Sequence, residues 1–217
     1  TQVSPTSTVG PATPTPTRTA TATRQTIEHE FSGVGSKVLG PIDIVEGVLV
    51  LVATHRGTSN FMVRVVGDTE TLSINEIGQY GGAIAHAVSS SGIFGLAPGE
   101  VSIQIEADGA WDLGTEQQFP SGGKPPPIEV KDEGSDVINW LLLRKGQHIL
   151  TATHQGSSNF IVRLINADGS NTELVVNDIG RYSGEHLINV GGTIFSPSPG
   201  IYSLAVEADG PWTVDIR

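Results

Sequence analysis

The feature that most constrains the fold is an internal repeat that covers most of the 217-residue chain. Three blocks of sequence occur twice, in the same order and with nearly constant spacing. Residues 53–64 (ATHRGTSNFMVR) recur at 152–163 (ATHQGSSNFIVR), residues 75–80 (NEIGQY) at 177–182 (NDIGRY), and residues 106–111 (EADGAW) at 207–212 (EADGPW). Self-similarity of this kind predicts two copies of one domain.

Within each copy, apolar residues recur with a period of two, the pattern of a strand with one buried face. Val101, Ile103 and Ile105 alternate with polar residues, and a continuous apolar run at 48–53 predicts a central strand buried on both sides. Turn pairs such as Asp108-Gly109 recur at strand spacing. We therefore predict an all-β chain of two tandem antiparallel β-sandwich domains, jelly-roll-like, with seven or eight strands each.

The composition divides the chain into four segments. Residues 1–26 form a Thr/Pro-rich tail, 27–116 the first β-sandwich repeat, 117–127 a Pro/Gly linker and 128–217 the second repeat. The tail is too poor in apolar residues to offset its chain entropy, so we expect it to be extended. The prolines of the linker stiffen it into a spacer, so we expect the two domains to be strung end to end without a shared core.

Thr/Pro tracts of this kind are typical of stalks on cell surfaces, and they favour an extracellular or cell-surface location. The hydroxyl groups of the tail are candidate sites for O-linked sugars, and an unmodified spacer is the alternative. The candidate O-glycosylation sites are Thr13, Thr15, Thr17, Thr19, Thr21 and Thr23.

Charge and cysteine content exclude several functions. A net charge of −11, with 12 basic residues spread over the chain, argues against nucleic acid as a partner, because a duplex binder needs a concentrated basic face. The chain has no cysteine, which removes disulfides and thiolate sites. No apolar stretch is long enough for a membrane helix, so we expect no direct membrane insertion. We expect no cofactor and no metal site.

Two histidines, His55 and His154, occupy the same place in their copies. One histidine per domain is a poor metal site, because several ligands must converge on an ion. Both precede a Gly-Ser-Asn type turn, in which Asn60 and Asn159 can bond their own backbone. We expect each imidazole to bond a nearby backbone group.

The Glu-Ala-Asp-Gly-x-Trp motif allows three interpretations. Its carboxylates, Glu106 with Asp108 in the first copy, would serve Ca²⁺ only with further oxygen ligands. Glycosidase carboxylates flank a sugar from opposing walls, whereas these share one strand end. We favour a hairpin, in which Asp-Gly makes the turn and the tryptophan leads the last strand into the core.

Aromatic residues raise the alternative of a sugar-binding surface. Trp111, Trp212, Tyr80 and Tyr182 are candidate ligand-stacking side chains, although a chain with 6% aromatic residues needs most of them for its cores. Trp140 has no aromatic counterpart in the first copy, and we expect it to pack at the domain junction.

The segment directly after the tail has the alternation of a strand, with Ile27, His29 and Phe31 on one face. By default it is the first strand of its own domain. The alternative is donation to a neighbouring chain, which would complete that neighbour's sheet and link chains head to tail.

The repeated motifs at 34–116 and 133–217 resemble a β-sandwich domain of secreted bacterial and archaeal surface proteins. That resemblance implies an exported β-sandwich without an assigned activity. We therefore expect a non-enzymatic extracellular structural protein, a self-associating subunit of a surface filament, sheath or stalk, for which strand donation from the N-terminal segment is one route of assembly. A carbohydrate-binding or adhesive module is the alternative, and a hydrolase is disfavoured because no convergent acid/base set can be assembled.

Overall fold

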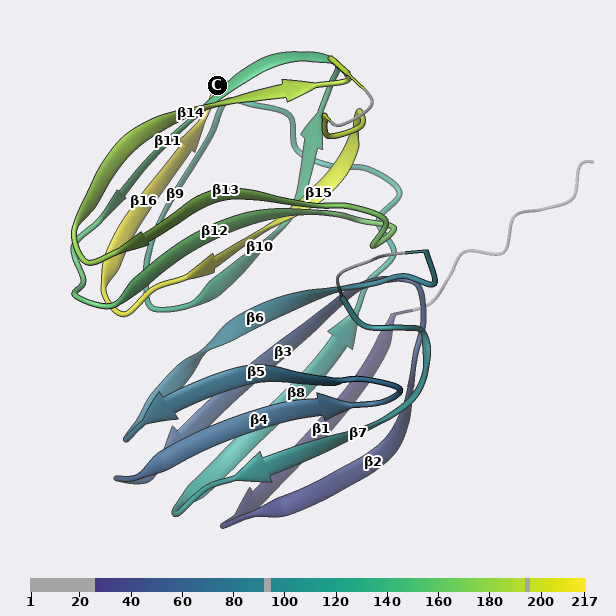
Figure 1. Cartoon of the computed structure of the whole chain (residues 1–217), viewed down its shortest axis with the longest axis vertical. Helices are drawn as coiled ribbons and strands as arrows, with labels where there is room; N and C mark the ends of the chain where they lie inside the picture. Colours follow the sequence, from purple (N-terminus) through teal and green to yellow (C-terminus); the bar gives the residue numbers. More distant parts are fainter. Residues whose placement is uncertain (1–25, 92–94, 194–195) are drawn as a thin grey trace, which may run out of the picture.

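A computed structural model describes residues 26–91, 95–193 and 196–217. This part of the chain is all-β, with sixteen strands arranged as two similar halves that lie against each other (Figure 1). The strands of the first domain are β1 (Ile27–Val34), β2 (Lys37–Ile44), β3 (Gly47–Arg56), β4 (Asn60–Val66), β5 (Glu70–Ile77), β6 (Tyr80–Val88), β7 (Gly99–Glu106) and β8 (Ala110–Gln117). No helix in these residues is long and apolar enough to cross a membrane.

The second domain repeats the first strand for strand. Its strands are β9 (Ile128–Glu133), β10 (Asp136–Leu143), β11 (Gly146–His154), β12 (Asn159–Asn166), β13 (Thr172–Ile179), β14 (Tyr182–Val190), β15 (Gly200–Glu207) and β16 (Pro211–Ile216). Each domain has two four-stranded sheets, β1-β8-β3-β6 with β2-β7-β4-β5, and β9-β16-β11-β14 with β10-β15-β12-β13. All strand pairs within these sheets are antiparallel, and the strand order is that of a jelly roll, as predicted.

Each domain has a core of its own, because the alternating apolar residues of its two sheets face one another. Phe61, Val63 and Val65 on β4 are fully buried, while Met62 and Arg64 between them are half-buried. The corresponding residues of β12 lie in the core of the second domain. The period-two prediction is confirmed in both copies.

A third apolar cluster joins the two domains, contrary to the expectation that the linker holds them apart. Val48 and Val50 point out of the first domain's core and are nevertheless buried, with three alanines of β6 beside them. The second domain covers them with Ile165 and Ala205, with Val137 and Trp140 packed alongside. The predicted burial of 48–53 on both faces is confirmed for its first residues, and the second domain supplies the outer cover.

The linker also differs from a free spacer. Strand β8 continues through Gln117, and the residues that follow lie along β10. The amide of Lys124 donates to the carbonyl of Trp140 over 2.8 Å, and the indole of Trp140 donates to the Gln118 side chain over 3.1 Å. Trp140 therefore packs at the domain junction, as predicted.

Candidate functional site

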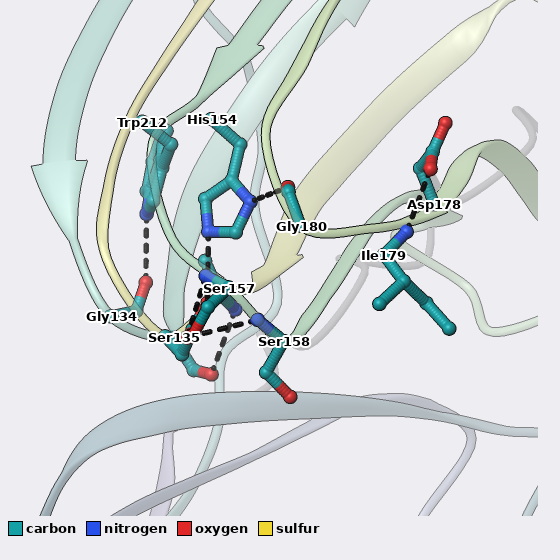
Figure 2. Close-up of polar contacts among 11 residues, drawn as sticks. Gly134, Ser135, His154, Ser157, Ser158, Asp178, Ile179, Gly180 and Trp212 are labelled. Carbon is teal, nitrogen blue, oxygen red and sulfur yellow. Dashed lines mark hydrogen bonds and ion pairs between the residues drawn. The ribbon is translucent and has the colours of Figure 1, made fainter.

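The retained polar residues of each copy meet at one end of its sandwich. In the second domain, three turns converge there: the turn after β11, the turn after β13 and the turn between β15 and β16. Figure 2 shows the polar contacts at this corner, which we call the His–Asp corner and define by His154, Gly156, Ser157 and Asp209. The first domain has the same corner at His55, Gly57, Thr58 and Asp108.

Asp209 fixes the backbone of the neighbouring turn. Its carboxylate accepts hydrogen bonds from the amides of Ser157 and Ser158 over 2.9 and 3.0 Å, and from the Ser157 hydroxyl over 3.0 Å. These contacts join turns more than fifty residues apart in sequence, so they close the end of the sandwich. In the first domain, Asp108 accepts the equivalent bonds from the Thr58 amide, the Thr58 hydroxyl and the Ser59 amide.

The same bonds set the charge of the two aspartates. The hydrogen bond from the Thr58 amide has the largest effect, and it holds the pKa of Asp108 below its usual range. The Ser59 amide and the Thr58 hydroxyl lower this pKa further. For Asp209, partial burial opposes this effect, but the donors on Ser157 and Ser158 outweigh burial and lower the pKa. Both groups are therefore carboxylates at neutral pH.

The buried histidine bridges the corner to the third turn. The Nδ1 atom of His154 lies 2.7 Å from the carbonyl oxygen of Gly180, so Nδ1 carries a proton and donates it there (Figure 2). The ring stacks on Phe160 with an angle of 8° between the planes. His55 makes the same bond to Gly78 over 2.7 Å. The prediction that each imidazole bonds a backbone group is confirmed.

The second ring nitrogen faces the aspartate. The Nε2 atom of His154 lies 3.2 Å from the Asp209 carboxylate, and that of His55 lies 3.3 Å from Asp108. This is an ion-pair distance, although neither Nε2 makes a well-directed hydrogen bond. Each ring therefore has an oxygen atom close to both of its nitrogens, a backbone carbonyl at Nδ1 and a carboxylate at Nε2.

The corner does not have the geometry of a hydrolase triad. The Ser157 hydroxyl donates to Asp209 and not to His154, so no base is positioned to activate it. The glutamates of the repeated motif pair elsewhere: Glu207 with Arg163, and Glu106 with Arg64. Within the described ranges, no group of three His, Asp or Glu side chains lies close enough to hold a metal ion.

The Asp-Gly turn differs from the predicted hairpin. Strand β7 pairs with β2 and β4, whereas β8 pairs with β1 and β3, so the turn at Asp108-Gly109 crosses from one sheet to the other. The tryptophan after the turn does lead the last strand into the core, as expected. In this jelly roll most consecutive strands lie in opposite sheets, and only β4 with β5 and β12 with β13 pair directly, which the local turn signal could not reveal.

Both candidate stacking tryptophans are buried, at 2% exposure each. The indole of Trp111 donates to the carbonyl of Gly35 over 2.8 Å, and that of Trp212 to Gly134 over 2.7 Å. These side chains cannot stack on a sugar, which corrects that part of the carbohydrate hypothesis. Both tryptophans fill space in the cores of their domains, which agrees with the expectation that a chain with few aromatic residues needs most of them there.

The two candidate tyrosines are half-buried and lie in different settings. Tyr182 bonds His186 on its own strand. Tyr80 lies at the domain junction, where burial, Glu76 and Glu207 raise the pKa of its hydroxyl. The structure therefore does not bring the four predicted aromatic residues together on one surface.

Tyr80 lines a cleft of about 460 Å³ between the two domains. The cleft is polar: Glu76 and Gln79 face Asn159 and Asp209 across it. Burial, followed by the charges of Asp209 and Glu207, raises the pKa of Glu76. Sequence reasoning missed this cleft, because it exists only through the packing of one domain on the other.

The N-terminal strand lies in its own domain. β1 pairs antiparallel with β8 over eight residues, from Ile27 opposite Gln117 to Val34 opposite Ala110. Ile27, His29 and Phe31 share its inward face and are half-buried. The candidate glycosylation sites from Thr13 to Thr23 lie outside the described residues.

No protein-family model matches the chain, and no curated protein matches it.

Proposed function

We propose that this chain is a non-enzymatic extracellular structural protein, a self-associating subunit of a surface filament, sheath or stalk. Two features support this role. The aspartates, histidines and turn residues retained in both copies form the His–Asp corners, which hold the turns at that end of each domain together. The apolar junction also makes the two domains one block, which suits a load-bearing or spacing element.

The observation that carries the proposal is the position of β1. It is an edge strand, and none of its residues is fully buried. The equivalent edge strand β9, in the middle of the chain, contributes the buried Ile128 to its core. A strand at the end of the domain that gives little to the core can be supplied by a neighbour in the same register, as in strand addition.

The connection from β1 to β2 is suited to such an exchange. The strands belong to different sheets and are joined only by Gly35 and Ser36. The carbonyl of Gly35 is held by the indole of Trp111, and a Cβ on Gly33 would lie 2.5 Å from the Trp111 ring. A neighbour's β1 would make these same contacts, because they involve only β1, its turn and β8.

A cysteine pair tests the exchange, since the chain has no native cysteine. Ser32 and Asp112 are opposite each other on β1 and β8, and both are exposed. The Ser32→Cys/Asp112→Cys variant, oxidised after assembly, should give covalent ladders on a non-reducing gel. The control is Lys131→Cys/Thr213→Cys, which places the equivalent cysteine pair on β9 and β16. Its disulfide should form only within one chain.

Electron microscopy of the same samples tests the structural role itself. We expect regular polymers of the full chain, and their loss when β1 is held in its own domain by the oxidised Ser32–Asp112 pair before assembly. Polymers whose cysteine pairs close only within chains would refute strand donation. A protein that stays monomeric up to millimolar concentration would refute the structural role.

A second proposal is a carbohydrate-binding or adhesive module, supported by the polar cleft at Tyr80. Carboxylates and amides around one aromatic ring suit recognition of sugar hydroxyls. A glycan array that shows binding lost in Tyr80→Ala, but kept in the equivalent Tyr182→Ala, would support this role. Equal binding by both variants, or none by the native chain, would exclude it.

A further inference from the structure

The junction between the domains joins two different surfaces. The first domain contributes the β6 surface, defined by Val48, Val50, Ala83, Ala85 and Ala87. The second contributes the β10 face, defined by Val137, Trp140, Ile165 and Ala205. Because the domains are copies, each also has the surface that the other one uses, and one of each kind is left over.

The two leftover surfaces lie on opposite domains. The β14 surface of the second domain corresponds to the β6 surface and consists of Gln147, Ile149, Glu185, Leu187 and Asn189. The β2 face of the first domain corresponds to the β10 face and consists of Val38, Pro41, Val66 and Gln104.

Each leftover surface exposes a large apolar side chain at an interface position. Leu187 is 62% exposed, whereas Ala85 at the same place in the first domain is 4% exposed inside the junction. Val38 is 71% exposed, whereas Val137 at the same place packs against the junction cluster. Within the chain, β6 contacts β10, so an equivalent contact between chains would bring β14 to β2 and Leu187 toward Val38.

One acid and one base, Glu185 and Lys37, lie on the two leftover surfaces, and Glu185 also pairs with Arg217 of its own chain. At the junction, the amide of Ala83 donates to the carbonyl of Ser135, next to Asp136. The equivalent residues between chains are Glu185, Ser36 and Lys37, so an acid would lie beside a base. Polar residues also replace apolar ones on both sides: Gln147 and Asn189 on one, and Gln104 on the other. Matched polar residues suit a contact that forms and dissociates between separate chains.

We propose that copies of this chain associate end to end, with the β14 surface of one seated on the β2 face of the next. The contact repeats the internal domain junction. Because it joins two different surfaces, it does not close on itself as a two-fold contact does, and it adds chains head to tail into an open array or a ring. This inference rests on the proposed self-association of the chain, but not on exchange of β1.

Cysteine crosslinking between two singly substituted chains tests the contact. Val38→Cys and Leu187→Cys are mixed and treated with a short bismaleimide, and we expect crosslinked dimers that neither variant forms alone. Ala85→Cys/Val137→Cys, at the junction, is the positive control and should crosslink within one chain. Ile77→Cys mixed with Leu187→Cys is the negative control, because Ile77 is exposed on β5, at the opposite edge of the sheet from β2.

Charge reversal tests the specificity of the contact. In sedimentation velocity, Lys37→Glu should weaken self-association by about tenfold, and the added Glu185→Lys change should restore it. Val38–Leu187 crosslinking no greater than the negative control would overturn the inference. If ladders from Ser32→Cys/Asp112→Cys still form in that case, the proposed structural role stands and only this contact is wrong. If neither crosslink forms and the chain stays monomeric, both proposals are wrong.

Discussion

Gly156 lies so close to His154 that a Cβ added to the glycine would stand 2.4 Å from the Nε2 atom of the ring. The same Cβ would lie 2.0 Å from the Asp209 carboxylate. In the first domain, a Cβ on Gly57 would meet His55 and Asp108 at nearly the same distances. The glycine of each turn is therefore required by the packing of the His–Asp corner.

Replacing this glycine should destabilise the second domain. Gly156→Ala forces the His154 ring or the Asp209 carboxylate to move, and overpacking of this kind costs about 1–3 kcal/mol. Urea unfolding followed by tryptophan fluorescence measures the loss. Gly122→Ala is the control, because no atom lies within 4 Å of a Cβ built there. Equal stability of the two variants would contradict the packing argument.

Removing the carboxylate of the corner should also destabilise the fold. Asp209→Ala leaves the amides of Ser157 and Ser158 without their acceptor, which we expect to cost about 2 kcal/mol of unfolding free energy. Asp178→Ala removes the same side chain from a site where it bonds only the adjacent Ile179 amide. That control should change stability by less than about 0.5 kcal/mol.

The pH dependence of stability should report the same carboxylate. The folded state lowers the pKa of Asp209, so its contribution is present above the unfolded value of about 3.9 and is lost as pH falls through the folded value. We expect the native chain to lose stability more steeply than Asp209→Asn on acidification from about pH 4. Parallel curves for the two proteins would exclude the aspartate as a source of acid sensitivity.

The strands and the duplication were predictable from the sequence, because both can be recognised from the order of residues along the chain without knowledge of which strands pair. The spacing of Val101, Ile103 and Ile105 identifies a half-buried strand wherever that strand pairs. The repeat then transfers each assignment to the second copy. The backbone bond of His154 was also predictable, since a turn follows it at once.

The sheet to which each strand belongs was not predictable, because pairing partners lie far apart in sequence. The turn at Asp108-Gly109 has the composition of a hairpin turn and yet joins two sheets. The pairing of His55 with Asp108 was not predicted for the same reason, because the two residues lie far apart in the chain. Val48 and Val50 indicated burial on both faces but not which residues would cover them, so the apolar cluster at the junction and the cleft beside it were not predicted.

Glu76 should be unfavourable as a carboxylate at neutral pH. Its raised pKa means that the folded state holds the proton more tightly than the unfolded state does. The ionised side chain therefore lowers stability above the folded pKa, and the protonated side chain does not. Glu76→Gln should therefore raise the unfolding free energy at pH 7, by less than about 1 kcal/mol because solvent screens the group. The gain should vanish near pH 4. Asp178→Asn, at the equivalent place away from the cleft, should show no such gain.

The domain junction should depend on the small apolar residues of β6. Ala85→Asp places a charge without a partner among Val48, Val50 and Ala205, which we expect to cost about 3 kcal/mol or to separate the domains. Leu187→Asp makes the same change at the equivalent exposed position and should alter the stability of the monomer by less than about 0.5 kcal/mol. Unfolding curves measure the first effect, and an increased radius of gyration in small-angle scattering would show separation. If the two variants behave alike in both measurements, burial of β6 by the second domain does not hold the two domains together. The internal junction would then give no support to the proposed contact between chains.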